Sequence, residues 1–151
     1  MPKVDLPLDQ RNIIITRSKE GILDIKKIFI SKGANVFDLP AISIADPDDL
    51  NPLDEALNQI NDFHWIIFSS SNGIKFVDKR LRYFNSSLKE CSKKTKIAVV
   101  GEKTSKTLDD FGIKADFIPP EFVAESLIDN FPVSGYGLRV FVPRVQTGGR
   151  D

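Results

Sequence analysis

Polar and small residues follow directly on an apolar run near the middle of the chain. Trp65–Phe68 are aromatic and β-branched, and Ser69–Gly73 then supply three hydroxyls, an amide and a glycine before Ile74, Val77 and Leu81 recur at helical spacing. This pattern is typical of a strand buried on both faces, a short turn and a helix. Free N–H groups at such a helix start, together with hydroxyls, suit an anionic ligand. An ordinary turn in which Ser or Asn caps the helix explains the same residues, so both interpretations stand.

Polar or small residues also follow other apolar runs. Thr16 and Arg17 end the first run, Gly101 follows a later run with Thr104 close behind it, and Arg144 follows the last run. Ligands of open α/β sheets bind at the carboxyl ends of the strands. We therefore predict an anion-accepting surface at the carboxyl ends of the two strands in the middle of the chain.

The elements that must position these residues alternate between strand and helix. The predicted strands lie at 12–16, 36–39, 65–69, 96–100, 115–118 and 138–143. The predicted helices lie at about 18–33, 51–60, 74–84, 102–111 and 122–131, with a short one around Leu88. Residues 41–49 fit an edge strand or an extended connection. The alternation is typical of an α/β protein with a parallel sheet, and the first strand–helix–strand unit should be right-handed.

Residues at the helix ends give further local predictions. Ser18 and Asn51 are predicted to cap the first two helices, and Gly33 and Gly112 are predicted to end helices as left-handed residues. The buried stripe of the first helix should include Ile22, Ile25, Ile28 and Phe29.

Composition narrows the class of protein. The 151 residues contain 21 Lys and Arg against 21 Asp and Glu, so no overall field points to nucleic acid or a membrane. Cys91 is the single cysteine and His64 the single histidine, which excludes a disulfide framework and argues against a zinc site. No apolar run is long enough to span a bilayer, no signal core is visible, and neither G-x-G-x-x-G nor a P-loop is present. A cytoplasmic protein is the simplest interpretation.

The end of the chain is unusual for a parallel sheet. Only eight residues, Arg144–Asp151, follow the last predicted strand, although a helix normally covers such a strand. The pattern suggests a fragment, and a natural short tail is the alternative.

Several segments, taken in order, resemble the uroporphyrinogen-III synthase family over about residues 12–150. The central segment 65–74, WIIFSSSNGI, resembles the family's hydrophobic-F-T-S-x-N-(G/A)-V pattern, with Ser69 in place of the commoner threonine. The other matching segments are IITR at 14–17, LPAISI at 39–44, AVVGEKT at 98–104, FVAESL at 122–127 and Pro143-Arg144. Ser105 stands where the family usually has alanine after V-G-x-x-T.

The resemblance implies a flavodoxin-like or Rossmann-like α/β fold of two domains, of which this chain holds an incomplete portion. Residues 1–11 would be a leader, 12–40 a βαβ piece of the first domain, and 41–151 the second domain without its last helix and strand. The active site would lie in the cleft between the two domains.

The resemblance also implies a reaction. The family closes linear hydroxymethylbilane into uroporphyrinogen III, with inversion of the last pyrrole ring and loss of water, and uses no metal or organic cofactor. The substrate carries acetate and propionate groups that need many donors. A chain that holds one cleft wall should bind substrate poorly and should not turn it over unaided.

Residue roles follow from matching the family's segments. Hydroxyl and backbone donors to substrate carboxylates are expected from Ser70, Ser71, Asn72 and Gly73. Gly101 would let the ligand approach the backbone closely. Thr104 is the candidate catalytic side chain near the reacting end, and a plain helix-capping role is the alternative. Arg17, Arg144 and Ala124 are expected as further substrate contacts, whereas Glu125 is expected to stabilise a helix start.

Two other functions also fit the sequence. One is a non-catalytic α/β module that binds an anionic small ligand, and the other is an inactive fragment of the enzyme. Turnover of hydroxymethylbilane separates the enzyme from both.

Overall fold

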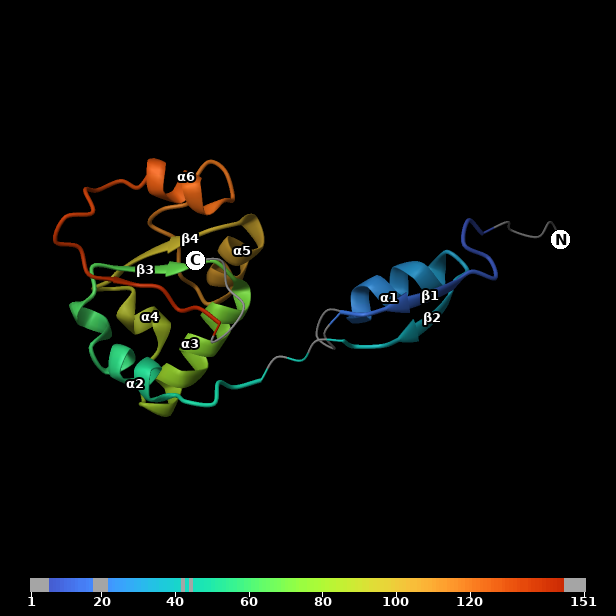
Figure 1. Ribbon diagram of the computed structural model, residues 1–151, viewed down its shortest axis with the longest axis horizontal. Coiled ribbons are helices and arrows are strands. Elements are labelled where there is room, and N and C mark those ends of the chain that lie inside the picture. The colour runs from blue at the N-terminus through green and yellow to red at the C-terminus, as the bar shows by residue number, and fades with distance from the viewer. Residues whose placement is uncertain (1–5, 18–21, 42, 44, 146–151) are drawn as a thin grey trace. The chain divides into compact units, whose positions relative to one another are not determined.

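The computed structural model describes residues 6–17, 22–41, 43 and 45–145, which form two compact units, Met1–Pro47 and Asp48–Asp151 (Figure 1). Ser18 lies outside the described residues, so its predicted capping role stays a prediction. The assignment of the two units to the two family domains also stays a prediction.

The first unit is a single βαβ motif. β1 (Asn12–Ile15) and β2 (Asn35–Asp38) pair in parallel, with α1 (Ile22–Ser31) between them in sequence. Gly33 has a φ of 93°, which confirms its predicted left-handed conformation after the helix. Ile15 and Ile22 are buried, but Ile14 is 61% exposed and its partner across the sheet, Phe37, is 56% exposed. Ile28 is also exposed, so the predicted buried stripe of α1 is wrong at that position.

The second unit is built on a parallel sheet, as the sequence predicts. Its strands are β3 (Trp65–Phe68), β4 (Lys96–Val99) and β5 (Val140–Phe141), in the order β4-β3-β5. Both pairings are parallel, and an isolated parallel bridge joins Ala98 to Phe117 at the outer side of β4. β3 is therefore the central strand, and the turn after it lies in the middle of one sheet edge.

Helices cover the sheet from two sides. They are α2 (Asn51–Asn58), the 3-10 turn Ile60–Asp62, α3 (Ser71–Tyr83), α4 (Leu88–Cys91), α5 (Glu102–Asp110) and α6 (Ala124–Asp129). α2, α3 and α4 lie below β3 and β4 in the view of Figure 1, and α6 lies above them.

One apolar cluster joins the sheet to α3, α4 and α5. Ile66, Phe68, Ile97 and Val99 are fully buried, and they pack with Ile74, Val77 and Leu81 of α3, Leu88 of α4 and Leu108 of α5. Burying each of these side chains stabilises the fold by about 1.5–3 kcal/mol. This core fixes the strand ends from which the polar turns project.

The structure shortens three predicted elements. The predicted strand 115–118 is reduced to the bridge at Phe117, partly because the Asp116 carboxylate accepts the Ile97 N–H at 2.8 Å in place of a backbone carbonyl. The prolines that follow end the pairing. β5 covers only 140–141 of the predicted 138–143, and α6 covers only 124–129 of the predicted 122–131.

The start of α2 also differs from the prediction. Leu50 is the N-cap residue, and Asn51 is already helical. The Asn51 N–H donates to the Asp49 carboxylate at 2.9 Å. The capping oxygen therefore comes from Asp49 and not from the predicted Asn51 amide, while Pro52 fits the first turn as predicted.

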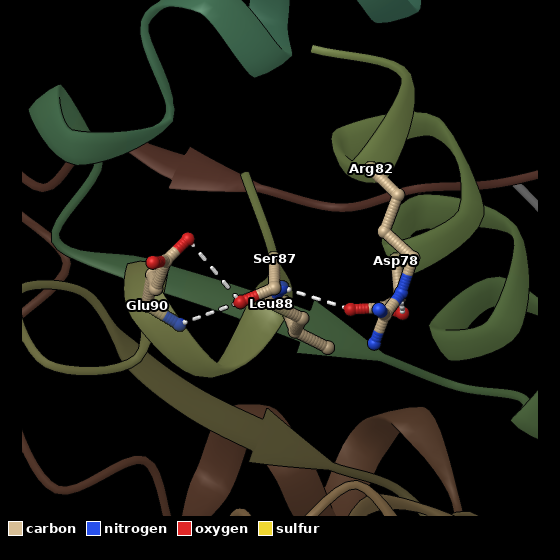
Figure 2. A network of polar contacts seen from close by, with 5 residues as sticks. All are labelled: Asp78, Arg82, Ser87, Leu88 and Glu90. Carbon is tan, nitrogen blue, oxygen red and sulfur yellow. Dashed lines mark hydrogen bonds and ion pairs between the residues drawn. The ribbon is translucent and has the colours of Figure 1, made fainter. Parts of the chain in front are cut away.

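A buried carboxylate connects α3 to α4 (Figure 2). Asp78 is only 3% exposed, and it accepts hydrogen bonds from the Leu88 N–H at 3.0 Å and from Arg82 Nε at 2.6 Å. Ser87 caps α4, because its hydroxyl accepts the Glu90 N–H at 3.3 Å. These contacts account for Asp78 as a structural residue that holds the predicted short helix in place.

Candidate functional site

The turn after β3 builds the first part of the site. Ser70 has an extended backbone and is the N-cap of α3, and its hydroxyl accepts the Gly73 N–H at 3.1 Å. The capping interpretation of this turn is therefore confirmed for Ser70. Asn72 is exposed in the first turn of α3, at the carboxyl end of the central strand.

The turn after β4 builds the second part. Gly101 is the N-cap of α5 with φ 99° and ψ 142°, a conformation that is open essentially to glycine alone. Within the part of the chain that the structure describes, no side chain caps this helix. The first N–H groups of an α-helix have no acceptor within the helix, so those of Glu102, Lys103 and Thr104 are directed past Gly101. This helix start can accept an anionic group.

Thr104 lies beside these N–H groups. Its side chain is only 5% exposed, and its hydroxyl oxygen is 3.8 Å from the position that a Cβ atom on Gly101 would take. Within residues 6–17, 22–41, 43 and 45–145, no group forms a hydrogen bond with this hydroxyl. No fully buried side-chain oxygen among the described residues lacks a partner, so the Thr104 hydroxyl reaches the surface, where it is able to donate a hydrogen bond to a ligand.

Ser71 connects the two turns. Its hydroxyl is 3.3 Å from the Lys103 carbonyl oxygen and 3.0 Å from the Thr107 hydroxyl, which is itself 3.0 Å from the same carbonyl. Both hydroxyls are thereby engaged with α5. Thr107 is not among the residues predicted from the sequence, although its spacing of three residues from Thr104 and four from Lys103 places it next to them on one helix face.

The charges at the start of α5 partly offset each other. Lys106 Nζ pairs with the Glu102 carboxylate at 2.7 Å on the exposed side of the helix. The hydrogen bond between them lowers the pKa of Glu102 and raises the pKa of Lys106. The pairing reduces the repulsion that Glu102 would exert on an anion at the helix start.

The other predicted contacts are Arg17, Arg144 and Ala124. Because β5 runs parallel to β3 beside it, Arg144 follows β5 at the same sheet edge as the turn after β3. Arg17 is exposed in the first unit, whereas exposed Arg144 follows β5 in the second. Ala124 is the first residue of α6, a helix of six residues on the other side of the sheet from α3. The structure thus brings Ser71 together with the first turns of α5, and it does not bring Ala124 into this group. The roles of Arg17, Arg144 and Ala124 stay predictions.

Two further properties concern only the part of the chain that the structure describes. There, no group of three or more His, Cys, Asp and Glu side chains is placed to hold a metal ion. None of the described helices is long and apolar enough to cross a membrane.

Comparisons with known proteins place these features in a family context. A family model described as uroporphyrinogen-III synthase HemD matches residues 24–151. A uroporphyrinogen-III synthase from Synechococcus elongatus is 41% identical over 147 residues, which are 96% of this chain and 54% of the relative. A putative uroporphyrinogen-III synthase from Methanocaldococcus jannaschii is 32% identical over 117 residues, covering 77% of this chain and 45% of the relative.

A solved structure has a similar fold. A mutant uroporphyrinogen III synthase from Thermus thermophilus aligns with a TM-score of 0.58 at 10% identity, over 79% of this chain and 46% of that one. The likeness supports the α/β fold and its parallel sheets. The chain spans about half the length of the curated relatives that it matches.

Proposed function

We propose a function from one premise: the chain belongs to the uroporphyrinogen-III synthase HemD family, whose model matches residues 24–151. We propose that it takes part in closing hydroxymethylbilane to uroporphyrinogen III, a step of tetrapyrrole biosynthesis. The observation that carries the proposal is the 41% identity to the Synechococcus elongatus synthase over 96% of the chain. Because the chain covers 54% of that relative, the activity of the whole protein is part of the proposal.

The substrate carboxylates would bind at the carboxyl ends of β3 and β4. The N–H groups of Glu102, Lys103 and Thr104 are suited to this task, and the exposed Asn72 amide lies at the neighbouring helix start. Gly101 has no side chain, so a carboxylate oxygen could reach the α5 backbone. Ser70, Ser71 and Gly73 would act mainly by holding this turn in shape, because their polar groups already have protein partners.

Thr104 would act near the reacting end of the substrate. Ring closure requires the hydroxymethyl group to lose its oxygen as water, and a hydrogen bond to that oxygen assists its departure. The Thr104 hydroxyl is available for such a bond, because no described group already forms a hydrogen bond with it. Holding the linear chain in one folded geometry would supply much of the remaining rate enhancement.

The proposal extends to properties of the whole protein. We propose that the reaction needs no cofactor, that the protein is a cytoplasmic monomer, and that Arg17, Arg144 and Ala124 contact substrate carboxylates. We also propose that turnover needs the half of the family's length that this chain does not span. The 151-residue chain would then bind the tetrapyrrole weakly and would not cyclise hydroxymethylbilane by itself.

A paired assay tests the proposal. The 151-residue chain and the full-length Synechococcus elongatus relative are incubated separately with hydroxymethylbilane, and the type I and type III products are separated by chromatography after oxidation. We expect the type III isomer from the relative only, and weak binding of uroporphyrinogen III by the 151-residue chain. Type III product from the short chain well above spontaneous closure would overturn the claim of incompleteness. If the 151-residue chain neither cyclises hydroxymethylbilane nor binds uroporphyrinogen III, the proposed function is overturned.

A further inference from the structure

Two hydroxyls hold the starts of α3 and α5 together. Ser71 is the first residue of α3, and Thr107 lies one turn beyond the first residues of α5. Their oxygen atoms are 3.0 Å apart, and both lie within 3.3 Å of the Lys103 carbonyl oxygen. The two residues are 36 positions apart in sequence, so this contact joins turns that two different strands supply.

Protein acceptors are sufficient to take the hydroxyl protons of both Ser71 and Thr107. If Thr107 donates to the Ser71 oxygen, Ser71 donates to the Lys103 carbonyl, and neither hydroxyl keeps a proton for a ligand. Thr107 is buried and Ser71 is half-buried, so the bond between the two hydroxyls is partly shielded from water, whereas the bond from Ser71 to the Lys103 carbonyl is exposed. The contact fixes Lys103, whose N–H is one of the free donors at the start of α5.

We propose that Ser71 and Thr107 are positioning residues that set the spacing between the Asn72 helix start and the Gly101–Thr104 helix start. This inference rests on the proposed function, since the spacing matters only if carboxylates of one ligand bind both helix starts. Ser71 then acts through Lys103 and does not itself contact the ligand. Loss of the contact lets α5 move relative to α3, and a ligand held by both loses affinity.

The chain offers a matched control at the opposite end of the same strand. Thr95 immediately precedes β4, is 1% exposed and donates its hydroxyl proton to the Ile60 carbonyl at 3.1 Å. Thr95 and Thr107 are thus buried threonines that hydrogen-bond backbone carbonyls, one on each side of β4. Replacing either by valine removes a hydroxyl of the same kind, but only Thr107 lies at the proposed ligand surface.

The test measures affinity and stability together for the 151-residue chain. Uroporphyrinogen III, kept reduced, is titrated into the wild type, Thr107→Val, Thr107→Ser and Thr95→Val and followed by amide NMR shifts, while Tm is measured separately. We expect Thr107→Val to weaken binding about tenfold, which corresponds to about 1.4 kcal/mol. Thr107→Ser keeps the hydroxyl and should restore affinity to within about twofold, and Thr95→Val should lower Tm without changing affinity.

The outcomes separate this inference from the proposed function. A wild-type chain that binds no uroporphyrinogen III overturns the proposed function and this inference with it. A wild-type chain that binds, with unchanged affinity in Thr107→Val, overturns the positioning role alone. Equal loss of affinity in Thr95→Val and Thr107→Val also overturns it, because general destabilisation would then explain both variants.

Discussion

The polar groups at the two ends of β3 and β4 differ in whether they have hydrogen-bond partners. At the amino end, the Thr95 hydroxyl donates to the Ile60 carbonyl, and His64 Nδ1 accepts the Arg139 N–H at 3.0 Å. The His64 backbone also donates to the Arg139 carbonyl and accepts from the Lys96 N–H. At the carboxyl end, Gly101 leaves α5 without a side-chain cap, and the Thr104 hydroxyl has no partner among the described residues.

We interpret this difference as a division of roles within one sheet, in which residues at the amino end serve stability and residues at the carboxyl end serve binding. Polar groups at the amino end are paired with one another, so they hold β3, β4 and β5 in register. At the carboxyl end Ser70, Ser71 and Thr107 are also paired, but the first N–H groups of α5 and the Thr104 hydroxyl have no partner among the described residues and could bind a ligand, as in open α/β sheets. Substitutions at the amino end should therefore change stability, and substitutions at the carboxyl end should change binding.

The largest expected effect comes from Gly101→Val, which should change both properties. A β-branched residue at φ 99° strains the backbone, and we expect a loss of unfolding free energy of about 3 kcal/mol. The side chain would also cover the N–H groups of α5, so uroporphyrinogen III should no longer bind. Urea unfolding and NMR titration measure the two effects.

Gly112→Ala is the control for Gly101. Gly112 follows the other end of α5 with φ 69°, and a Cβ there would meet the flexible end of the Lys89 side chain at 3.1 Å. We expect a loss of about 1 kcal/mol and unchanged binding. Binding by Gly101→Val as tight as in the wild type would show that the start of α5 is not the ligand surface.

Thr95→Val should give the next largest effect, and on stability alone. The substitution removes the hydroxyl donor to the Ile60 carbonyl, which keeps the Phe63 N–H as its other donor, so the loss is about 1.5 kcal/mol. Affinity for uroporphyrinogen III should stay as in the wild type, as measured by the same titration. A variant with native Tm and weakened binding would reverse the assignment of the two ends.

Thr104→Val should change ligand binding and leave stability nearly unchanged. Valine has nearly the same shape, and the lost hydroxyl has no described protein partner, so Tm should change little. Uroporphyrinogen III lacks the hydroxymethyl oxygen that Thr104 is proposed to contact, so the affinity loss of about tenfold, or about 1.4 kcal/mol, is expected for hydroxymethylbilane. In a full-length family member, the equivalent substitution should lower the yield of type III product. A large fall in Tm would indicate a structural role instead.

The smallest expected effect is a pH dependence of stability. It arises near the C-terminal end of α3, on the side of the sheet where β3 and β4 begin. Hydrogen bonds from Arg80 lower the pKa of Asp54 below its ordinary value. The ionised carboxylate therefore adds stability above its unfolded-state pKa, and this contribution is lost as pH falls through the lower folded-state pKa. Asp54→Asn should be less stable than the wild type near neutral pH, and the difference should shrink in acid. A difference that stays constant down to strongly acidic pH would contradict this assignment.

The sequence predicted the elements whose signals are local. Ile74, Val77 and Leu81 recur at helical spacing and are buried in α3, and Gly112 ends α5 with positive φ as predicted. The parallel sheet followed from alternating strands and helices. These features depend on neighbouring residues, so one sequence is sufficient to find them.

The sequence did not reveal contacts made across long separations. Asp116 replaces a backbone acceptor for Ile97, 19 residues away, and this shortens the predicted strand 115–118. Ser71 contacts Thr107 over 36 residues, and this contact is the basis for proposing it as a positioning residue, while its predicted role as a ligand donor stays a prediction. A side-chain bond to a distant partner leaves no periodic pattern, so only the folded chain shows it.

An NMR map of uroporphyrinogen III binding tests the contrast between the two strand ends most directly. Reduced uroporphyrinogen III is added stepwise to the isotope-labelled 151-residue chain, and the shift of every assigned amide is followed. We predict that the largest shifts fall at Ser70–Gly73 and Gly101–Thr104, with little change at His64, Thr95 and Arg139. Shifts concentrated at His64, Thr95 and Arg139, or spread evenly over both ends, would contradict it.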